Sequence, residues 1–350
     1  MDVDRLRSAV DWRDGRLEVI DQTALPEELR VLELHTVAEV VGALRRLAVR
    51  GAPAIGVCAA FGVVLGLRER EPRDLGEAQA VLARVAAELE AARPTAVNLR
   101  WAVRRVAAVA RDQATDPAEL QRLALAEALR LLEEDRASCR RIGEHGRAEL
   151  ASRRRILTHC NTGRLATAGA GTALGIVYAK AAAREPVEVW ATETRPLLQG
   201  ARLTAWELVD AGIPVTLLPD TAAGSAMARG LVDSVLVGCD RVARNGDTAN
   251  KIGTYNLAVL ARANGIPFHV AGPMSSFDPD AADGRAIVVE ERAGAEVRFL
   301  GGTRLTPDGA QVWNPAFDVT PAALVTAFVT DAGVLRPPFA DSIARALERT

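Results

Sequence analysis

The chain is predicted to be an α/β protein, with a doubly wound parallel sheet preceded by a mainly helical region and a short β-meander. Two observations predict this fold. After about residue 153, short apolar runs alternate with helical stretches, and before it apolar residues recur at spacings of three and four. Strand-helix alternation of this length is typical of a parallel sheet with right-handed crossovers. We therefore predict two domains, over residues 1–147 and 148–350.

The first domain opens with short strand-like runs and continues as helices. The predicted strands are Ser8–Trp12, Arg16–Ile20 after an Asp-Gly turn, and Leu29–Leu34. Helical periodicity then covers Val37–Leu47, Ala78–Ala92, Leu99–Val109 and Leu120–Leu132. The apolar run from Pro53 to Leu67 is too short to span a bilayer, so a buried helix is expected there.

The second domain contains five apolar runs of strand length with helical stretches between them. The predicted strands are Ile156–His159, Val187–Trp190, Val215–Leu218, Ser234–Val237 and Phe268–Ala271. The predicted helices are Ala166–Ala183, Gly200–Ala211, Ala222–Gly230 and Lys251–Asn264.

Composition excludes several classes of function. The 350 residues carry a net charge of -2, so no basic field favours nucleic acid or an anionic membrane as a partner. The first residues do not form a signal peptide, and the four cysteines show no CxxC pairing, so reduced thiols in a cytoplasm are expected. The four histidines lack ligand spacing, so no metal is expected.

Polar groups follow two of the predicted strands at their carboxyl ends, where open α/β sheets bind ligands. Asp240 comes after the run Val235–Val237, and Asn250 and Lys251 follow where a new helix is expected to start. An amide and an ammonium at a helix N-terminus suit phosphate or sugar oxygens. Cys160 comes directly after the strand that ends at His159. A salt-bridged loop and an inert buried thiol are the structural alternatives.

Three further segments offer binding groups. Glu193–Gly200, which contains Gln199, is polar and leads into a helix. In Arg50–Gly56, Pro53 fits the first position of a helix. Gly51 and Ala52 leave its backbone accessible, and Arg50 adds a guanidinium, which together make an anion site. Arg93–Asn98 is a similar break before a helix and supplies a second arginine, Arg93. A solvated loop and a helix start with a surface arginine are the alternatives for these segments.

The glycine-rich run Gly169–Gly175 superficially matches a dinucleotide fingerprint. Its spacing is GxGxxxG, and the predicted helix from Ala166 places it inside a helix rather than at a strand-helix turn. We therefore expect close helix packing there and no nucleotide.

Five collinear motifs between about Arg50 and Pro321 resemble the methylthioribose-1-phosphate isomerase family, the aldose-ketose isomerases of methionine salvage. They are Arg50–Gly56, Thr158–Gly163, Glu193–Gly200, Asn245–Tyr255 and Asn314–Pro321. The resemblance implies a helical N-terminal lobe, a Rossmann-like catalytic lobe, a homodimer, a sugar-phosphate substrate and no cofactor.

The resemblance also implies roles for individual residues. Asp240 matches the proton donor to the ring oxygen, and Cys160 matches the thiol that stabilises the transition state. The substrate-binding positions are matched by Arg50, Gly51, Ala52, Arg93, Gln199, Asn250 and Lys251. One departure is Cys239, which stands where the family usually has alanine.

Two other functions remain open at this point. Isomerases of 5-deoxyribose 1-phosphate or ribose 1,5-bisphosphate have similar core motifs. Regulatory subunits of the translation-initiation exchange factor share the fold but act as binding modules, and such relatives need not keep both Cys160 and Asp240. A nucleotide-dependent dehydrogenase is disfavoured because the turn glycines are missing.

Overall fold

The computed structural model describes residues 7–94 and 96–349, so Thr95 of the predicted Arg93–Asn98 break lies outside the described residues. The described chain forms two compact units. A helical unit contains residues 7–137 and 164–171, and an α/β unit contains residues 138–163 and 172–349. The predicted domain boundary at residue 147 stays a prediction.

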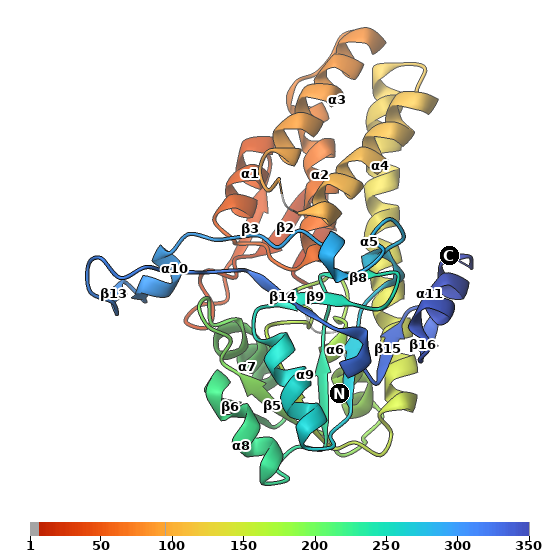
Figure 1. Ribbon diagram of the computed structural model, residues 1–350. Coiled ribbons are helices and arrows are strands. Elements are labelled where there is room, and N and C mark those ends of the chain that lie inside the picture. Colours follow the sequence, from red (N-terminus) through yellow and green to blue (C-terminus); the bar gives the residue numbers. More distant parts are fainter. Residues whose placement is uncertain (1–6, 95, 350) are drawn as a thin grey trace. The chain divides into compact units, whose positions relative to one another are not determined.

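The helical unit begins with an antiparallel meander and continues as a helical bundle (Figure 1). Its strands are β1 (Val10–Arg13), β2 (Arg16–Ile20) and β3 (Val31–Leu34). Its helices are α1 (Val37–Arg45), α2 (Ala52–Glu69), α3 (Leu75–Glu90), α4 (Val97–Gln113) and the part of α5 (Pro117–Glu149) up to residue 137.

Helix α2 is the centre of this unit. It is apolar and long enough to cross a membrane, but 78% of its apolar window is buried inside the protein, as in the core helix of a folded domain. Phe61 of α2 stacks on Trp12 of β1 with ring centroids 4.8 Å apart, which joins the meander to the bundle. Gly56 lies so close to α4 that an added Cβ would be 3.1 Å from the Asn98 carbonyl oxygen. The predicted buried helix over Pro53–Leu67 is therefore confirmed.

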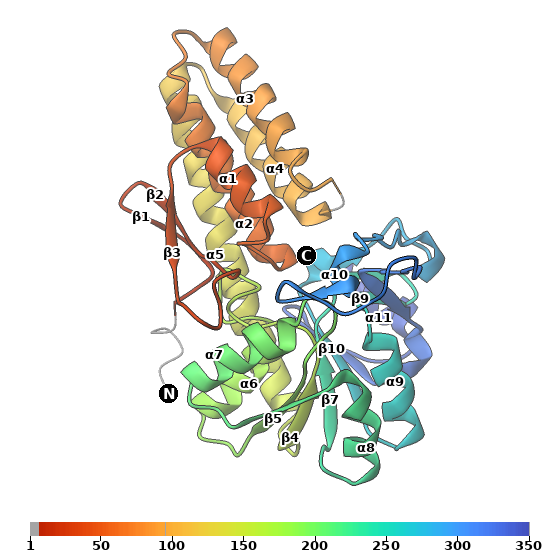
Figure 2. The same ribbon diagram turned by 90° about the vertical axis from the view of Figure 1, so that its left-hand side faces the viewer.

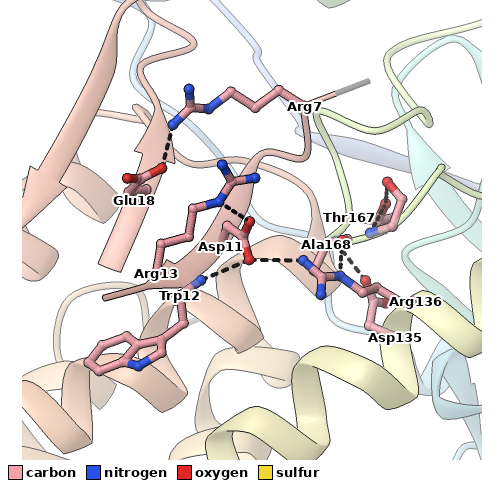
Figure 3. Close-up of polar contacts among 10 residues, drawn as sticks. Arg7, Asp11, Trp12, Arg13, Glu18, Asp135, Arg136, Thr167 and Ala168 are labelled. Atoms are coloured by element: carbon pink, nitrogen blue, oxygen red, sulfur yellow. Dashed lines mark hydrogen bonds and ion pairs between the residues drawn. The ribbon is translucent and has the colours of Figure 1, made fainter. Parts of the chain in front are cut away.

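Residues 164–171 return to the helical unit after the chain has left it. The Asp135 carboxylate accepts a hydrogen bond from the Ala168 amide at 2.6 Å, and Arg136 joins the same segment to Asp11 of β1 (Figure 3). The Gln22 amide donates to the Leu165 carbonyl at 2.7 Å. These contacts make the returning segment an integral part of the helical unit.

The α/β unit is built on a seven-stranded sheet with the order β16-β15-β10-β7-β4-β5-β6. All neighbours are parallel except β15 and β16. The strands are β4 (Arg155–Thr158), β5 (Glu188–Thr192), β6 (Val215–Leu218), β7 (Ser234–Val237), β10 (Phe268–Ala271), β15 (Ala327–Thr330) and β16 (Gly333–Leu335). The order reverses between β4 and β7, as in doubly wound folds, so the predicted fold class is confirmed.

Helices cover both faces of this sheet. Figure 2 shows α6 (Ala173–Ala182) and α7 (Ala205–Asp210) on one side of the strands, and α8 (Ala223–Ala228) and α9 (Thr254–Ala263) on the other. The core on the second side includes Phe328, whose ring makes edge contacts with Phe277 and with Phe339 of α11 (Phe339–Leu347).

A second, four-stranded sheet was not predicted. It has the order β11-β8-β9-β14 and consists of β11 (Phe277–Asp278), β8 (Arg241–Ala243), β9 (Thr248–Lys251) and β14 (Phe317–Thr320). Short elements between Gly284 and Arg304 follow β11, namely α10 (Ala295–Arg298), β12 (Phe299–Leu300) and β13 (Thr303–Arg304). Strand β8 of this small sheet is the next element in the chain after β7.

Two predicted helices begin later than expected. The helix predicted from Ala166 begins at Ala173, because residues 164–171 belong to the helical unit. Gly169 and Gly171 therefore precede the helix, so the prediction that they lie inside it was wrong, while the GxGxxxG spacing still differs from the dinucleotide fingerprint. The helix predicted from Lys251 begins at Thr254, because Asn250 and Lys251 pair with β14 as the end of β9.

Replacing each of two helical glycines of the helical unit by alanine should change the free energy of unfolding in opposite directions. An added Cβ at Gly66 of α2 would meet the Val37 and Val85 methyl groups at 2.6 Å, whereas one at Gly42 of α1 would meet nothing within 4 Å. We expect Gly42→Ala to raise the free energy of unfolding by about 0.5–1 kcal/mol through helix propensity. We expect Gly66→Ala to lower it by about 1 kcal/mol or more through overpacking. Urea unfolding of both variants checks this, and equal signs would contradict it.

Candidate functional site

The predicted thiol and carboxyl groups lie beyond the carboxyl ends of two neighbouring parallel strands. Cys160 follows β4, and Asp240 follows β7. These two strands pair directly, with Leu157 beside Val235, and the strand order reverses between them. A reversal of this kind leaves a crevice beyond the strand ends, which is where open α/β sheets bind ligands. The fold therefore brings Cys160 and Asp240 to the same edge of the sheet.

The loops that carry these two residues touch each other. A Cβ at Gly238 would come within 2.7 Å of the Thr162 Cγ2 atom, so only glycine lets the loop after β7 pass the loop after β4 at this distance. The Asp240 amide donates to the Ala249 carbonyl at 2.9 Å, which joins this loop to β9. The Asp240 side chain is partly exposed, as is Cys160.

Cys160 has an unusual backbone that its neighbours hold in place. Its φ is +63°, in the left-handed region that residues other than glycine rarely adopt. Its amide donates to the Thr194 hydroxyl at 2.9 Å, and its carbonyl accepts from the Thr204 hydroxyl at 2.6 Å. Both backbone groups of a strained residue are therefore bonded to side chains, a pattern that occurs at functional sites.

The segment with Gln199 lies beyond β5, the strand on the other side of β4. Asp220 holds its start, because the Asp220 carboxylate accepts from the amides of Thr194 and Arg195, each at 2.7 Å. Gln199 is buried, and a π-helix follows it at Gly200–Thr204. A Cβ at Gly200 would lie 1.7 Å from the Thr192 carbonyl oxygen, so this helix begins in contact with the end of β5. The prediction that the segment Glu193–Gly200 follows a strand is therefore confirmed.

Asn250 and Lys251 lie at the end of β9 and are both buried. The Asn250 amide donates to the Thr254 hydroxyl at 3.0 Å, and the Lys251 ammonium lies 4.9 Å from the centre of the Phe317 ring. The quadrupole of an aromatic ring attracts a cation over its face, so Phe317 helps to position the Lys251 ammonium.

Sequence reasoning missed Asp318 as a residue of this region. Asp318 pairs with Asn250 across β14 and β9, and its carboxylate accepts from the amides of Gly253 and Tyr255 at 2.7 and 3.1 Å. Burial raises the pKa of the Asp318 carboxyl to about 6, although both amides and the Lys251 charge act in the opposite direction. The signal for it was available, because Asp318 belongs to the Asn314–Pro321 motif.

The remaining predicted residues belong to the helical unit. Gly51 has φ of +86° and caps α2, which begins at Ala52, so Pro53 is the second helical residue rather than the first. The Ala54 amide already donates to the Ala166 carbonyl at 3.3 Å. The close approach of Gly56 to Asn98 places the first turns of α2 and α4 side by side.

Arg50 and Arg93 therefore precede neighbouring helix starts, since Arg93 lies in the turn before α4. The structure groups Arg50, Gly51, Ala52 and Arg93 at one end of the helical unit, and Cys160, Gln199, Asp240, Asn250 and Lys251 at one edge of the α/β sheet. That all nine act on one ligand stays a prediction. Among residues 7–94 and 96–349, no group of three or more His, Cys, Asp or Glu side chains could hold a metal ion.

Comparisons with known proteins agree with the arrangement of the fold. The profile of the Initiation factor 2 subunit family matches residues 48–337. A 5-deoxyribose 1-phosphate isomerase from Moorella thermoacetica and a methylthioribose-1-phosphate isomerase from Desulforudis audaxviator are each 53% identical over 97% of both chains. The structure of 5-methylthioribose 1-phosphate isomerase from Pyrococcus horikoshii matches with a TM-score of 0.94 and 41% identity, over 99% of this chain and 97% of its own.

A structure described as translation initiation factor eIF-2B subunit delta from A. fulgidus also matches. Its TM-score is 0.89 at 43% identity, over 98% of this chain and 100% of its own. The resemblance to the methylthioribose-1-phosphate isomerases and the predicted class of enzyme, an aldose-ketose isomerase, are confirmed by these relatives.

The left-handed backbone of Cys160 should affect the free energies of unfolding of two variants at this position. Because a side chain costs about 1–2 kcal/mol in this conformation, we expect Cys160→Gly to be more stable than Cys160→Ala by about 1 kcal/mol. Cys139, which lies inside helix α5, is the matched control, and there the glycine variant should be the less stable. Urea unfolding of the four variants measures both differences. The same order at both positions would contradict the strained conformation.

Asp318 should give the free energy of unfolding a distinct pH dependence. A carboxyl whose pKa is higher in the folded than in the unfolded chain stabilises the fold most below its unfolded pKa of 3.8, and this contribution is lost as the pH rises through about 6. We expect the stability of wild type relative to Asp318→Asn to fall, by on the order of 2 kcal/mol, between about pH 4 and pH 7. Urea unfolding across this range tests it. A difference that rises with pH would show that the amides and Lys251 outweigh burial.

Proposed function

The chain belongs to the Initiation factor 2 subunit family, and we propose that it is an isomerase that converts 5-methylthioribose 1-phosphate to 5-methylthioribulose 1-phosphate in methionine salvage. One observation carries the proposal. A thiol and a carboxyl group, Cys160 and Asp240, follow the two strands between which the sheet order reverses. Relatives that are about half identical along their whole length and carry the isomerase name support it.

The chemistry of this substrate requires an acid. Its anomeric oxygen carries phosphate, so the ring cannot open to a free aldehyde as it does in an ordinary sugar. The bond between C1 and the ring oxygen must break while the phosphate stays on C1. We assign the proton for the ring oxygen to Asp240, which is partly exposed, follows the carboxyl end of β7 and has its backbone bonded to β9.

Ring opening develops positive charge at C1, and hydrogen must then pass from C2 to C1. In one route a hydride moves from C2 to C1, and Cys160 stabilises the charge or helps to accept the proton of the C2 hydroxyl. In the other, a base removes the C2 proton to give an enolate and returns a proton at C1. An enclosed site favours the hydride route, because water would quench the cation.

The binding groups divide by chemistry. Asn250 and Gln199 are buried amides that suit sugar hydroxyls, and the buried ammonium of Lys251 suits the phosphate. In the helical unit, Arg50 with the Gly51 and Ala52 backbone, together with Arg93, forms the proposed phosphate anchor, because a helix N-terminus and a guanidinium both favour an anion. We further propose that the protein is a homodimer and acts in the cytoplasm.

A second candidate function is isomerisation of 5-deoxyribose 1-phosphate. The 53% identity to an enzyme of that name is the observation in its favour. The two substrates share the ribose 1-phosphate and the ring-opening chemistry and differ only at C5, so the same acid and thiol serve both. A regulatory binding module of the same family is less well supported, because this chain keeps both Cys160 and Asp240.

Turnover of three sugars by the purified protein separates these functions. We expect methylthioribose 1-phosphate to give the ketose 1-phosphate, with ribose 1,5-bisphosphate inert, as phosphate at C5 would require a cationic pocket. A higher kcat/KM for 5-deoxyribose 1-phosphate would favour the second candidate. Turnover of none of the three would favour the binding module and overturn the enzyme.

The proposed acid is tested in the same assay. We expect Asp240→Asn to lower kcat by about 10²–10⁴-fold with little change in substrate binding, because the amide cannot donate the acid's proton. Asp233→Asn is the matched control. Asp233 precedes the amino end of the same strand and binds the amides of Arg154 and Arg155, far along the strand from the crevice. Equal activities of the two variants would remove Asp240 from the mechanism.

A further inference from the structure

We propose that His159 is a positioning residue that locks together three segments carrying the reacting and binding groups of the site. The inference rests on the proposed function for its meaning, because it concerns how Cys160, Asn250 and Lys251 are held for the reaction. Its contacts, however, are fixed by the α/β unit alone, and none of the roles assigned above includes His159.

The imidazole of His159 bridges segments that are distant in sequence. Its Nδ1 atom lies 2.6 Å from the hydroxyl of Thr192, the last residue of β5. Its Nε2 atom lies 2.8 Å from the carbonyl oxygen of Ile252, in the turn between β9 and α9. His159 itself directly precedes Cys160. One side chain therefore joins the ends of β4 and β5 to the residue that follows Lys251.

The partners determine the protonation of the ring. A carbonyl oxygen can only accept a hydrogen bond, so the Nε2 atom must carry the proton that is donated to Ile252. In the neutral ring Nδ1 is then an acceptor, and the Thr192 hydroxyl must donate to it. Burial, aided by the Lys251 charge, lowers the pKa of His159 below its ordinary value, although Asp220 and the Ile252 carbonyl act in the opposite direction. The neutral Nε2-protonated ring is thus the form present near pH 7.

The same hydrogen-bond chain reaches the backbone of Cys160. The Thr192 hydroxyl lies 3.3 Å from the Thr194 hydroxyl, which accepts from the Cys160 amide at 2.9 Å. The Thr194 hydroxyl has one proton and two acceptors at 3.3 Å, the Thr192 hydroxyl and the Thr192 carbonyl. When it donates to the hydroxyl, the donors run in one direction from the Cys160 amide to the Ile252 carbonyl. Such chains strengthen through mutual polarisation in a buried setting. The left-handed backbone of Cys160 and the turn after Lys251 are therefore coupled through His159.

The turn is shaped to receive the ring. Gly253 has φ of +105°, and a Cβ there would lie 3.0 Å from the His159 Cε1 atom and 3.1 Å from Nε2. A side chain at position 253 would thus push the imidazole away from the Ile252 carbonyl. On the other side of this turn, Asp318 accepts from the Gly253 amide. The Ile252–Gly253 turn is therefore bonded both to Asp318 and to His159. The bond to His159 connects the turn to the residue that precedes Cys160.

Two amide variants test this role without adding an apolar side chain. Glutamine can place its amide nitrogen near the position of Nε2 and keep the donor to Ile252, whereas the shorter asparagine reaches only the position of Nδ1. We expect His159→Asn to lose about 10²-fold in kcat/KM on methylthioribose 1-phosphate, the effect of a misplacement of about 1 Å, and His159→Gln to recover most of that loss. His269 is the matched control, because it is also buried in this sheet and bonds Ser234 in the neighbouring strand.

Two further measurements do not depend on turnover. The rate of alkylation of Cys160, followed by mass spectrometry of its peptide, should change in His159→Asn and return towards wild type in His159→Gln. Nitrogen-15 NMR of histidine-labelled protein near pH 7 should show the proton of this ring on Nε2, with the signal assigned by its loss in His159→Gln.

The outcomes separate this inference from the proposed function. Equal kcat/KM values for His159→Asn and His159→Gln would overturn the positioning role while leaving the isomerase intact. The same would follow if His269→Asn and His269→Gln differed in kcat/KM by the same ratio as the two His159 variants. A proton on Nδ1 would also overturn it. If wild-type protein turned over none of the sugars, the isomerase would fall, and the NMR and alkylation results would still decide whether His159 positions Cys160.

Discussion

The reversal of strand order between β4 and β7 is the constraint on which the rest of the α/β unit depends. From β4 the chain adds β5 and β6 to one side and then returns to add β7 on the other. Because parallel crossovers are right-handed, the helices α6 and α7 that precede the return cover one face. The helix α8 within the return and α9 after it cover the opposite face (Figure 2). The loops after β4 and β7, which carry Cys160 and Asp240, therefore lie at the reversal of strand order, the position at which open α/β sheets bind ligands.

This edge of the sheet is polar where a sheet interior is normally apolar. Behind Cys160, the buried carboxylate of Glu207 accepts from the Asn161 amide and, at 2.9 Å, from the Tyr178 hydroxyl. A Cβ at Gly163 would collide with the same carboxylate. Buried polar networks are costly when a partner is missing and rigid when all are present. The loop from Cys160 to Gly163 is therefore held by specific bonds, and its geometry does not depend on general apolar packing.

Much of this could be predicted from the sequence, for identifiable reasons. Ser234–Val237 and Phe268–Ala271 have their predicted bounds, because a strand buried on both faces needs a continuous apolar run. Val215–Leu218 also has its predicted bounds, although it is an edge strand with Thr216 and Leu217 exposed. Apolar runs also locate the strand ends, which is why Cys160 and Asp240 could be placed at one edge. Strand β9 contains Asn250 and Lys251, and its pairing with β14 is a contact between distant residues that no local pattern predicts.

Two other failures have the same physical origin. The three alanines among residues 166–171 favour a helix, but the helical unit holds this segment in turns and bends, with the Ala168 amide bonded to Asp135. Local preference is weak for such residues, and tertiary contacts override it. His159 could be recognised as a strand-end residue, but its role depends on Thr192 and Ile252, which lie 33 and 93 residues away in sequence.

The returning segment has a consequence for how the chain can be divided. The helical unit is assembled from two stretches of sequence, residues 7–137 and 164–171, and β4 with Cys160 lies between them. A fragment that ended near residue 137 would lack the carbonyls of Leu165 and Ala166, which accept from Gln22 and Ala54. The buried side-chain amide of Gln22 would lose its partner, and so would the Ala54 amide in the first turn of α2, next to Arg50 and Gly51. The helical unit therefore cannot be separated from the α/β unit by a single cut in the sequence.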